Sequence, residues 1–203
     1  STLSLYFLLF PFSLLFRSTG GAGFIGSRLA LQLLARGHKV RVLDNLAPQI
    51  HGDAPESSPL FRSIRDKVDF IRGDVTCRDD LLNALSGMDT VVHLAAETGT
   101  GQSMYAIGHY TGVNVGCTAL LLDLIANEPF PVKKIVVASS RAVYGEGKYH
   151  CSQHGTVFPS PRSAENMERG DFSVHCPVCG IPAELDASDE SNPVNPSSVY
   201  GIT

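Results

Sequence analysis

A glycine-rich turn near the amino terminus constrains the fold of this chain more than any other feature. The turn reads Thr19-Gly20-Gly21-Ala22-Gly23-Phe24-Ile25-Gly26. Apolar residues precede it, apolar residues at helical spacing follow it, and a β-type run ending at Asp44 comes about twenty residues later. A dinucleotide-binding loop requires this strand–turn–helix–strand context, whereas many glycine-rich turns outside it bind nothing.

Three glycines of the turn have separate physical uses. Gly20 can take a tight turn, Gly23 lets the backbone approach a pyrophosphate, and Gly26 lets the following helix pack close to the first strand. Backbone N–H groups at the start of that helix then face the phosphates. We therefore expect a nucleotide site at this turn.

The chain up to residue 140 alternates between strand and helix patterns. The expected strands cover residues 13–18, 39–43, 68–72, 90–96 and 134–140, and the expected helices cover residues 25–36, 78–85 and 113–127. The last strand is an apolar run of the kind buried on both faces of a parallel sheet. Residues 48–59, rich in Pro, Gly, Ser and Asp, are expected to form a surface loop. The alternation predicts an α/β fold with a doubly wound parallel sheet of the Rossmann type.

Two polar residues at the expected strands bear on the cofactor. Asp44, at the tip of the second strand, could accept hydrogen bonds from the ribose hydroxyls of adenosine and would repel a 2′-phosphate, which favours NAD over NADP. The alternative is that Asp44 only caps a loop. His93 lies inside an apolar strand, so a hydrogen-bonded core histidine is the preferred interpretation over a catalytic one.

Composition limits the class of protein. The chain has 203 residues and a net charge of −4, with 43% hydrophobic and 18% charged residues, which is typical of a soluble globular protein with one buried core. Because Lys and Arg do not cluster, we expect neither nucleic acid nor a membrane as a partner, and we expect a cytoplasmic location.

The amino-terminal residues fit this fold poorly. Residues 3–16 form an apolar run that Pro11 and Ser13 interrupt, too short for a membrane span and without the preceding basic residue of a signal peptide. We interpret residues 1–12 as an atypical lead-in and residues 13–203 as the NAD-binding domain. Arg17 is an unusual choice for a buried central strand.

From about residue 145 to residue 196 the sequence has no sustained periodicity and needs another source of order. The pairs Cys151-x-x-His154 and Cys176-x-x-Cys179 match a structural zinc site of the Cys₃His type. The alternatives are a redox pair or a secretory disulfide, and His150 or His175 could compete as ligands. We expect Cys77 and Cys117, which have no partner pattern, to be packing residues.

Six motifs in order resemble those of the extended short-chain dehydrogenase/reductase family, in particular its NAD-dependent nucleotide-sugar epimerases and dehydratases. They are the turn at 19–26, Asp44-Asn45-Leu46, Gly73-Asp74-Val75, His93-Leu94-Ala95-Ala96, Ser139-Ser140-Arg141-Ala142-Val143-Tyr144-Gly145 and Pro196-Ser197-Ser198-Val199-Tyr200-Gly201. The insertion with the two ligand pairs and the segment Glu97-Thr98-Gly99-Thr100-Gly101-Gln102-Ser103 resemble one 4-epimerase group of that family.

The resemblance implies a role for each matching position. The pyrophosphate would lie on Gly20, Gly23, Phe24, Ile25 and Gly26, the adenosine ribose on Asp44 and Asn45, the adenine at Asp74 and Val75, and the dinucleotide above Leu94, Ala95 and Ala96. Ser140 matches the catalytic Ser/Thr of the family, and Tyr200 matches the Tyr of its Tyr-x-x-x-Lys motif. Tyr200 as a tyrosinate would remove the proton of the sugar 4-hydroxyl while hydride passes to NAD.

Two departures from the family pattern matter. The 4,6-dehydratases carry an Asp-Glu pair after the Ser/Thr, but this chain has Arg141 and Ala142 there, which favours 4-epimerisation of a nucleotide-diphosphate sugar. The lysine of the motif would follow directly after Thr203, as would the substrate domain. We therefore expect the chain to be the cofactor-binding fragment of an enzyme that is a homodimer at full length, and to be inactive alone. A dehydratase or decarboxylase of the family, or a non-catalytic NAD-binding module, is the alternative.

Overall fold

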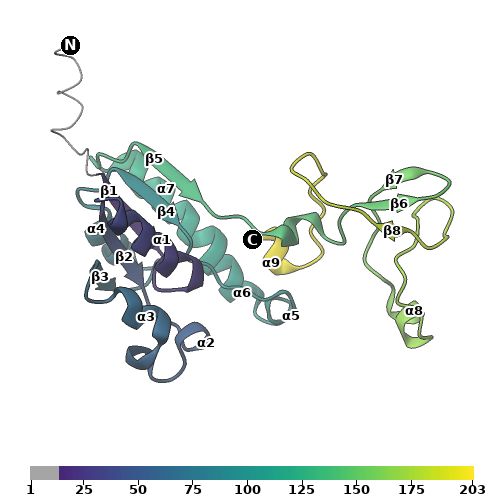
Figure 1. The fold of residues 1–203 in the computed structure, drawn as a ribbon, viewed down its shortest axis with the longest axis horizontal. Helices are drawn as coiled ribbons and strands as arrows, with labels where there is room; N and C mark the ends of the chain where they lie inside the picture. Colours follow the sequence, from purple (N-terminus) through teal and green to yellow (C-terminus); the bar gives the residue numbers. More distant parts are fainter. Residues whose placement is uncertain (1–13) are drawn as a thin grey trace, which may run out of the picture. The chain divides into compact units, whose positions relative to one another are not determined.

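The centre of the fold is a parallel sheet. The structure is a computed structural model that describes residues 14–203. The strands are β1 (Leu15–Thr19), β2 (Lys39–Asp44), β3 (Asp69–Arg72), β4 (Thr90–His93) and β5 (Lys134–Val137), all parallel, in the order β3-β2-β1-β4-β5 (Figure 1). This order confirms the predicted doubly wound sheet. The predicted first strand began at Ser13, which lies outside the described residues, and β1 runs one residue past the predicted end, to Thr19.

Helices cover both faces of the sheet. On one face α1 (Phe24–Ala35) and α3 (Pro59–Ile64) pack over Val40 and Val42, and on the other α4 (Arg78–Leu85) and α7 (Cys117–Asn127) pack over Leu43 and Val91. The predicted third helix is divided, because a π-helical turn, η3 (Thr111–Gly116), precedes α7. No helix within residues 14–203 combines the length and the apolar character needed to cross a bilayer.

The prediction of a surface loop at residues 48–59 was correct about the surface, because most of these side chains are exposed, but wrong about the loop. This segment contains α2 (Pro48–His51) and η2 (Pro55–Ser57), and α3 begins at Pro59. The prolines that suggested a loop stand at the first positions of these short helices, where the missing N–H group costs nothing. Two side chains of the segment, His51 and Ser58, are buried.

The prediction that β5 is buried on both faces was also wrong. The side chains of Val136 and Val137 are 43% and 49% exposed. Among the described strands β5 pairs only with β4 and is therefore an edge strand of this sheet. An apolar run in the sequence does not distinguish an edge strand from a central one.

The described chain divides into two compact units. The first contains residues 14–97 and 112–138, with the parallel sheet, and the second contains residues 98–111 and 139–203. The second unit is built from α5 (Thr100–Ser103), α6 (Ile107–Tyr110), η4 (Arg141–Tyr144), β6 (Tyr149–Cys151), β7 (Gly155–Val157), α8 (Ala164–Glu168), β8 (Glu184–Leu185) and α9 (Val199–Ile202). Its strands form a small antiparallel sheet in the order β7-β6-β8, so the segment that has no sustained periodicity in the sequence does contain short strands.

Candidate cofactor and catalytic sites

The predicted cofactor residues lie at one edge of the parallel sheet. The glycine turn follows β1, Asp44 ends β2, and Leu94 follows β4. Parallel strands present their carboxyl ends at the same edge, and the strand order reverses between β1 and β4. A doubly wound sheet binds its ligand at this switch point.

The glycine turn has the shape that a bound pyrophosphate needs. Gly20 has a φ of 65°, and a Cβ atom there would lie 2.7 Å from the backbone nitrogen of Ala95. A Cβ on Gly26 would lie 2.5 Å from the Cα of Gly21. By contrast, a Cβ on Gly23 would meet no atom closer than 3.4 Å, so the space beside Gly23 is open to a ligand.

The start of α1 is also free to receive an anion. No side chain among the described residues caps this helix, although Ser140 and Ser163 cap the amino ends of η4 and α8. Phe24 and Ile25, the first two residues of α1, have exposed side chains. The uncapped N–H groups of a helix start attract phosphate groups, so the turn and α1 together fit the pyrophosphate of NAD.

Asp44 has two backbone partners. Its Oδ2 accepts a hydrogen bond from the N–H of Ala22 at 2.9 Å, and its Oδ1 accepts one from the N–H of Leu46 at 2.9 Å. The carboxylate therefore caps the turn and the loop after β2, which was the alternative to ribose binding. A carboxylate has about four acceptor positions, so two backbone bonds leave capacity for ribose hydroxyls.

A histidine behind Asp44 was missed by the sequence analysis. His51 is buried, with its Nε2 atom 4.0 Å from Oδ1 of Asp44 and its Nδ1 atom 3.0 Å from Oγ of Ser58. His51 and Ser58 both belong to the segment that was predicted to be a loop. No local pattern in the sequence indicated that this segment folds against the end of β2.

The other predicted NAD-binding positions also follow the strand ends. Asn45 donates a hydrogen bond from Nδ2 to Oδ2 of Asp74 at 3.2 Å, which joins the ends of β2 and β3. The side chain of Val75 packs into the core beneath them. After β4, the N–H of Leu94 donates to the carbonyl of Thr19, and Ala95 and Ala96 continue this small-residue segment, with Ala96 exposed.

His93 is a hydrogen-bonded core residue, as predicted. Its Nδ1 atom lies 2.6 Å from Oγ1 of Thr19, and its Nε2 atom lies 3.1 Å from Oγ1 of Thr118. Burial lowers the pKa of His93 to about 4, so the ring is neutral at pH 7. Cys117 is buried beside it, and burial raises the pKa of its thiol to about 11. The packing prediction holds for Cys117 but was wrong for Cys77, which is exposed just before α4.

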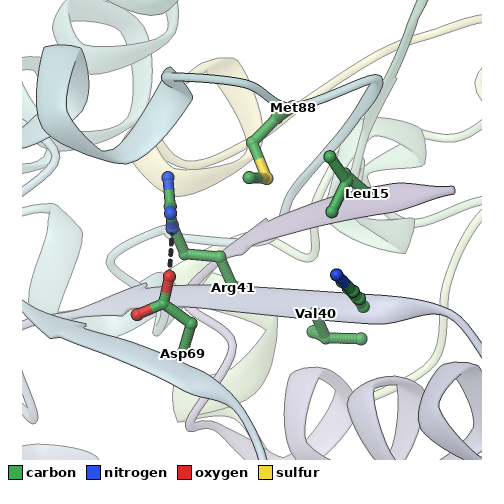
Figure 2. A pocket seen from close by; sticks show the side chains of 6 residues that line it. Leu15, Val40, Arg41, Asp69 and Met88 are labelled. Carbon is green, nitrogen blue, oxygen red and sulfur yellow. Dashed lines mark hydrogen bonds and ion pairs between the residues drawn. The ribbon is translucent and has the colours of Figure 1, made fainter.

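A small pocket lies at the opposite edge of the sheet. Figure 2 shows it beside the amino ends of three strands, where Leu15, Lys39 and Asp69 begin β1, β2 and β3. Two of its lining residues are paired, because Nε of Arg41 donates to Oδ2 of Asp69 at 2.6 Å. Because the glycine turn and Asp44 are at the carboxyl ends, this pocket is not the cofactor site.

In the second unit, the predicted catalytic residues lie on elements that pack together. Ser140 caps η4, its Oγ accepting the N–H of Ala142 at 3.2 Å. Tyr200 is on α9, and α9 lies so close to η4 that a Cβ on Gly201 would be 2.7 Å from the carbonyl oxygen of Ala142. This close approach brings the two elements together, and only glycine permits it.

Two further residues hold the helix that carries Tyr200, and the sequence analysis gave neither a role. The buried Oγ of Ser103 accepts the N–H of Tyr200 at 3.0 Å and donates to the carbonyl of Thr100 at 2.6 Å. The ring of Tyr110 lies edge-on to the ring of Tyr200 at 6.5 Å. Ser103 and Tyr200 are 97 positions apart, so no local spacing indicated their contact.

The four predicted metal ligands converge elsewhere in the second unit. One ligand atom from each of Cys151, His154, Cys176 and Cys179 lies within 4.8 Å of all the others. The competing histidines are not part of this group. His175 instead pairs with Asp171 at 3.2 Å.

The strand order and the uncapped glycine turn define a dinucleotide-binding α/β domain. The family model described as "NAD dependent epimerase/dehydratase family" matches residues 19–164. This chain belongs to that family.

Curated relatives and solved structures agree with this assignment. The chain is 37% identical to a dTDP-L-rhamnose 4-epimerase from Burkholderia thailandensis over 91% of this chain and 49% of the relative. It is 37% identical to a UDP-glucose 4-epimerase from Yersinia enterocolitica over 81% of this chain and 50% of the relative. The chain thus spans about half the length of these curated relatives.

Two solved structures have the same fold. The UDP-glucose 4-epimerase from Brucella ovis in complex with NAD superposes with a TM-score of 0.60 at 25% identity, over 94% of this chain and 44% of that one. The dTDP-glucose 4,6-dehydratase DesIV from Streptomyces venezuelae, solved with NAD bound, gives a TM-score of 0.62 at 26% identity, over 93% of this chain and 48% of that one.

Proposed function

We propose that the chain is the cofactor-binding part of an NAD-dependent nucleotide-sugar 4-epimerase that is a homodimer at full length. The observation that carries the proposal is the packing of η4 against α9, with Ser140 on one element and Tyr200 on the other. A module that only binds NAD has no use for this serine and tyrosine. The relatives named 4-epimerases support the same class.

The first unit would hold the cofactor. The glycine turn and the start of α1 would bind the pyrophosphate, while Asp44 and Asn45 would bind the adenosine ribose. Asp74 and Val75 would lie at the adenine, and Leu94 to Ala96 under the dinucleotide. NAD supplies a hydride acceptor that takes hydride from the sugar C4 and later returns it.

Tyr200 and Ser140 would move the proton at the sugar 4-hydroxyl. The phenolate oxygen of Tyr200 would take that proton as hydride leaves C4 and give it back when hydride returns to the other face. Ser140 would hydrogen-bond the same oxygen. Ser103 would hold Tyr200 in place, because its Oγ accepts the backbone N–H of the tyrosine.

Two residues favour epimerisation over elimination. A 4,6-dehydratase needs a carboxylic acid and a carboxylate after the catalytic Ser/Thr, to protonate the leaving hydroxyl and to remove a proton from carbon. Arg141 and Ala142 occupy these positions. Neither side chain can take up and release a proton near neutral pH, so the proposed product is the 4-epimer.

The test uses a protein in which Thr203 is followed by lysine and a family-length chain. Such a protein, incubated with UDP- and dTDP-hexoses and NAD, should form the 4-epimer, detected by NMR of the sugar. Tyr200→Phe and Ser140→Ala should each lower kcat by at least about 100-fold while NAD stays bound. Tyr105→Phe is the matched control, because Tyr105 is 95% exposed and should be dispensable.

Three outcomes would contradict the proposal. A 4-keto-6-deoxy product would identify a dehydratase, and NAD binding without turnover of any nucleotide sugar would favour a binding module. Full turnover in Tyr200→Phe would show that another residue moves the proton.

A further inference from the structure

We propose that Cys151, His154, Cys176 and Cys179 bind one structural Zn²⁺ ion. The metal is not required by the proposed epimerase chemistry, so this inference stands or falls separately from that function. Three cysteines and one histidine form a donor set that zinc prefers in closed tetrahedral sites.

Three of the six distances between the ligand atoms have the values that a zinc tetrahedron requires, and all six are within 4.8 Å. Zn–S bonds of about 2.3 Å and a Zn–N bond of about 2.0 Å at tetrahedral angles place neighbouring ligand atoms about 3.5 to 3.8 Å apart. Sγ of Cys151 lies 3.6 Å from Nδ1 of His154 and 3.7 Å from Sγ of Cys179. Sγ of Cys176 lies 3.7 Å from the same Nδ1 atom.

Two similar turns hold the four ligands. His154 is followed by Gly155 with a φ of 68°, and Cys179 is followed by Gly180 with a φ of 74°. In each turn the two ligands are three positions apart, with two residues between them, and the next residue is a glycine in the left-handed region. In the second turn the N–H of residue 178 points at Sγ of Cys176 at 3.4 Å, a contact that stabilises a thiolate.

The surroundings explain why a metal is needed. The buried residues of this cluster are Cys151, Val157 and Cys176, with a few half-buried neighbours. The sheet here has strands of three, three and two residues (Figure 1). So small a core does not stabilise a fold by burial alone, and a bound metal supplies the missing free energy.

Other uses of the cysteines fit the geometry less well. A disulfide requires sulfur atoms about 2.05 Å apart, whereas those of Cys151 and Cys179 are 3.7 Å apart and every described cysteine is free. A redox pair needs two thiols, yet here a third cysteine and a histidine converge on the same point. His150 is not placed to replace a ligand. Its side chain is exposed, and neighbouring residues of a strand point to opposite faces, so it points away from the ligand Cys151.

The experiment measures metal in the full chain, purified under reducing conditions without chelator. Mass spectrometry of the metal content should find about one zinc per chain. Replacement of zinc by Co²⁺ in the unchanged protein should give the intense visible bands and thiolate charge-transfer bands of a tetrahedral cobalt site. The Cys176→Ser/Cys179→Ser double variant should lose the zinc and the cobalt bands.

Cys77→Ser and His150→Ala are the matched controls. They remove an exposed cysteine and the histidine next to a ligand, and both should keep one zinc. Zinc removal by a chelator should also open residues 145–196 to limited proteolysis, as expected of a structural ion. The inference is overturned if the unchanged protein contains no zinc and gives no thiolate–cobalt bands, or if the double variant retains its metal. The cobalt measurement decides the question even where the double variant fails to fold.

Discussion

Replacing Arg17 by methionine should stabilise the first unit. Arg17 lies in the middle of β1, aligned with Arg41 on β2 and with Val91 on β4. It is fully buried, and its three guanidinium nitrogens have no hydrogen-bond partner within residues 14–203. An unpartnered buried charge opposes folding.

The size of the effect follows from the electrostatics of the site. Burial, and secondly the positive charge of Arg41, lower the pKa of Arg17 from its ordinary value to about 9, although Asp69 acts in the opposite direction. At about 1.4 kcal/mol per pKa unit, this lowering corresponds to a cost of about 5 kcal/mol at neutral pH, as an upper bound. Methionine has a similar unbranched stem and no charge, so we expect Arg17→Met to raise the free energy of unfolding by about 2 to 5 kcal/mol.

Urea unfolding followed by far-UV circular dichroism measures this gain, since the chain has no Trp. Above about pH 9 the folded state loses the Arg17 proton while the unfolded state keeps it, so the unfolded state binds more protons there. The penalty is therefore complete below pH 9 and is relieved as the pH rises through that value. The advantage of Arg17→Met should be constant from pH 6 to 8 and shrink above pH 9.

Arg28→Met is the control for this experiment. Arg28 is exposed on α1, so its replacement should change the stability by less than about 0.5 kcal/mol. If Arg17→Met were no more stable than the unchanged protein at pH 7, the guanidinium would have to be solvated or paired, and the reasoning would be refuted.

Three further predictions concern the cofactor edge of the sheet. NAD should bind roughly tenfold or more tightly than NADP, and Asp44→Ala should reduce this ratio of affinities, as measured by fluorescence titrations with NADH and NADPH. Equal affinities for the two cofactors in the unchanged protein would contradict the role of Asp44. Gly26→Ala should lower the free energy of unfolding by about 1 to 3 kcal/mol and weaken NAD binding, because its Cβ would lie 2.5 Å from the Cα of Gly21. The control Gly108→Ala should leave the free energy of unfolding unchanged, because a Cβ on Gly108 meets open space. Burial lowers the pKa of His93 from 6.5 to about 4, so the free energy of unfolding should fall by up to about 3 kcal/mol as the pH drops from 6.5 to 4. If a His93→Gln variant lost stability equally steeply with falling pH, His93 would not be the cause of that loss.

The sheet and the two ligand pairs could be predicted because their signals are local. Glycine spacing, alternating apolar runs and Cys-x-x-Cys pairs each encode a turn or strand within a few residues. A predicted helix at 78–85 coincides with α4, and the strand at 39–43 is β2 within one residue. The four metal ligands could be predicted for the same reason, because each turn carries two of them. Only the fold brings the two turns together.

Features that depend on distant neighbours were missed or misjudged. The burial of His51 and Ser58 depends on their packing at the end of β2, where His51 approaches Asp44. The exposure of Val137 depends on the position of β5 in the sheet order, and the contact between Ser103 and Tyr200 joins segments 97 positions apart. Composition carries no information about such pairings.

The sequence by itself therefore determined the family, the doubly wound sheet and the residue types offered to a dinucleotide and a metal, since short-range spacing and side-chain chemistry suffice for these. Only the tertiary structure decided which of the polar and charged side chains already have hydrogen-bond partners and which are buried without one. Asp44 has two backbone partners, His93 is hydrogen-bonded to two threonines and kept neutral by burial, and the guanidinium of Arg17 is buried without a partner among residues 14–203. The physical reason is that hydrogen bonding and desolvation are set by neighbours in space, and folding brings those neighbours from other parts of the chain.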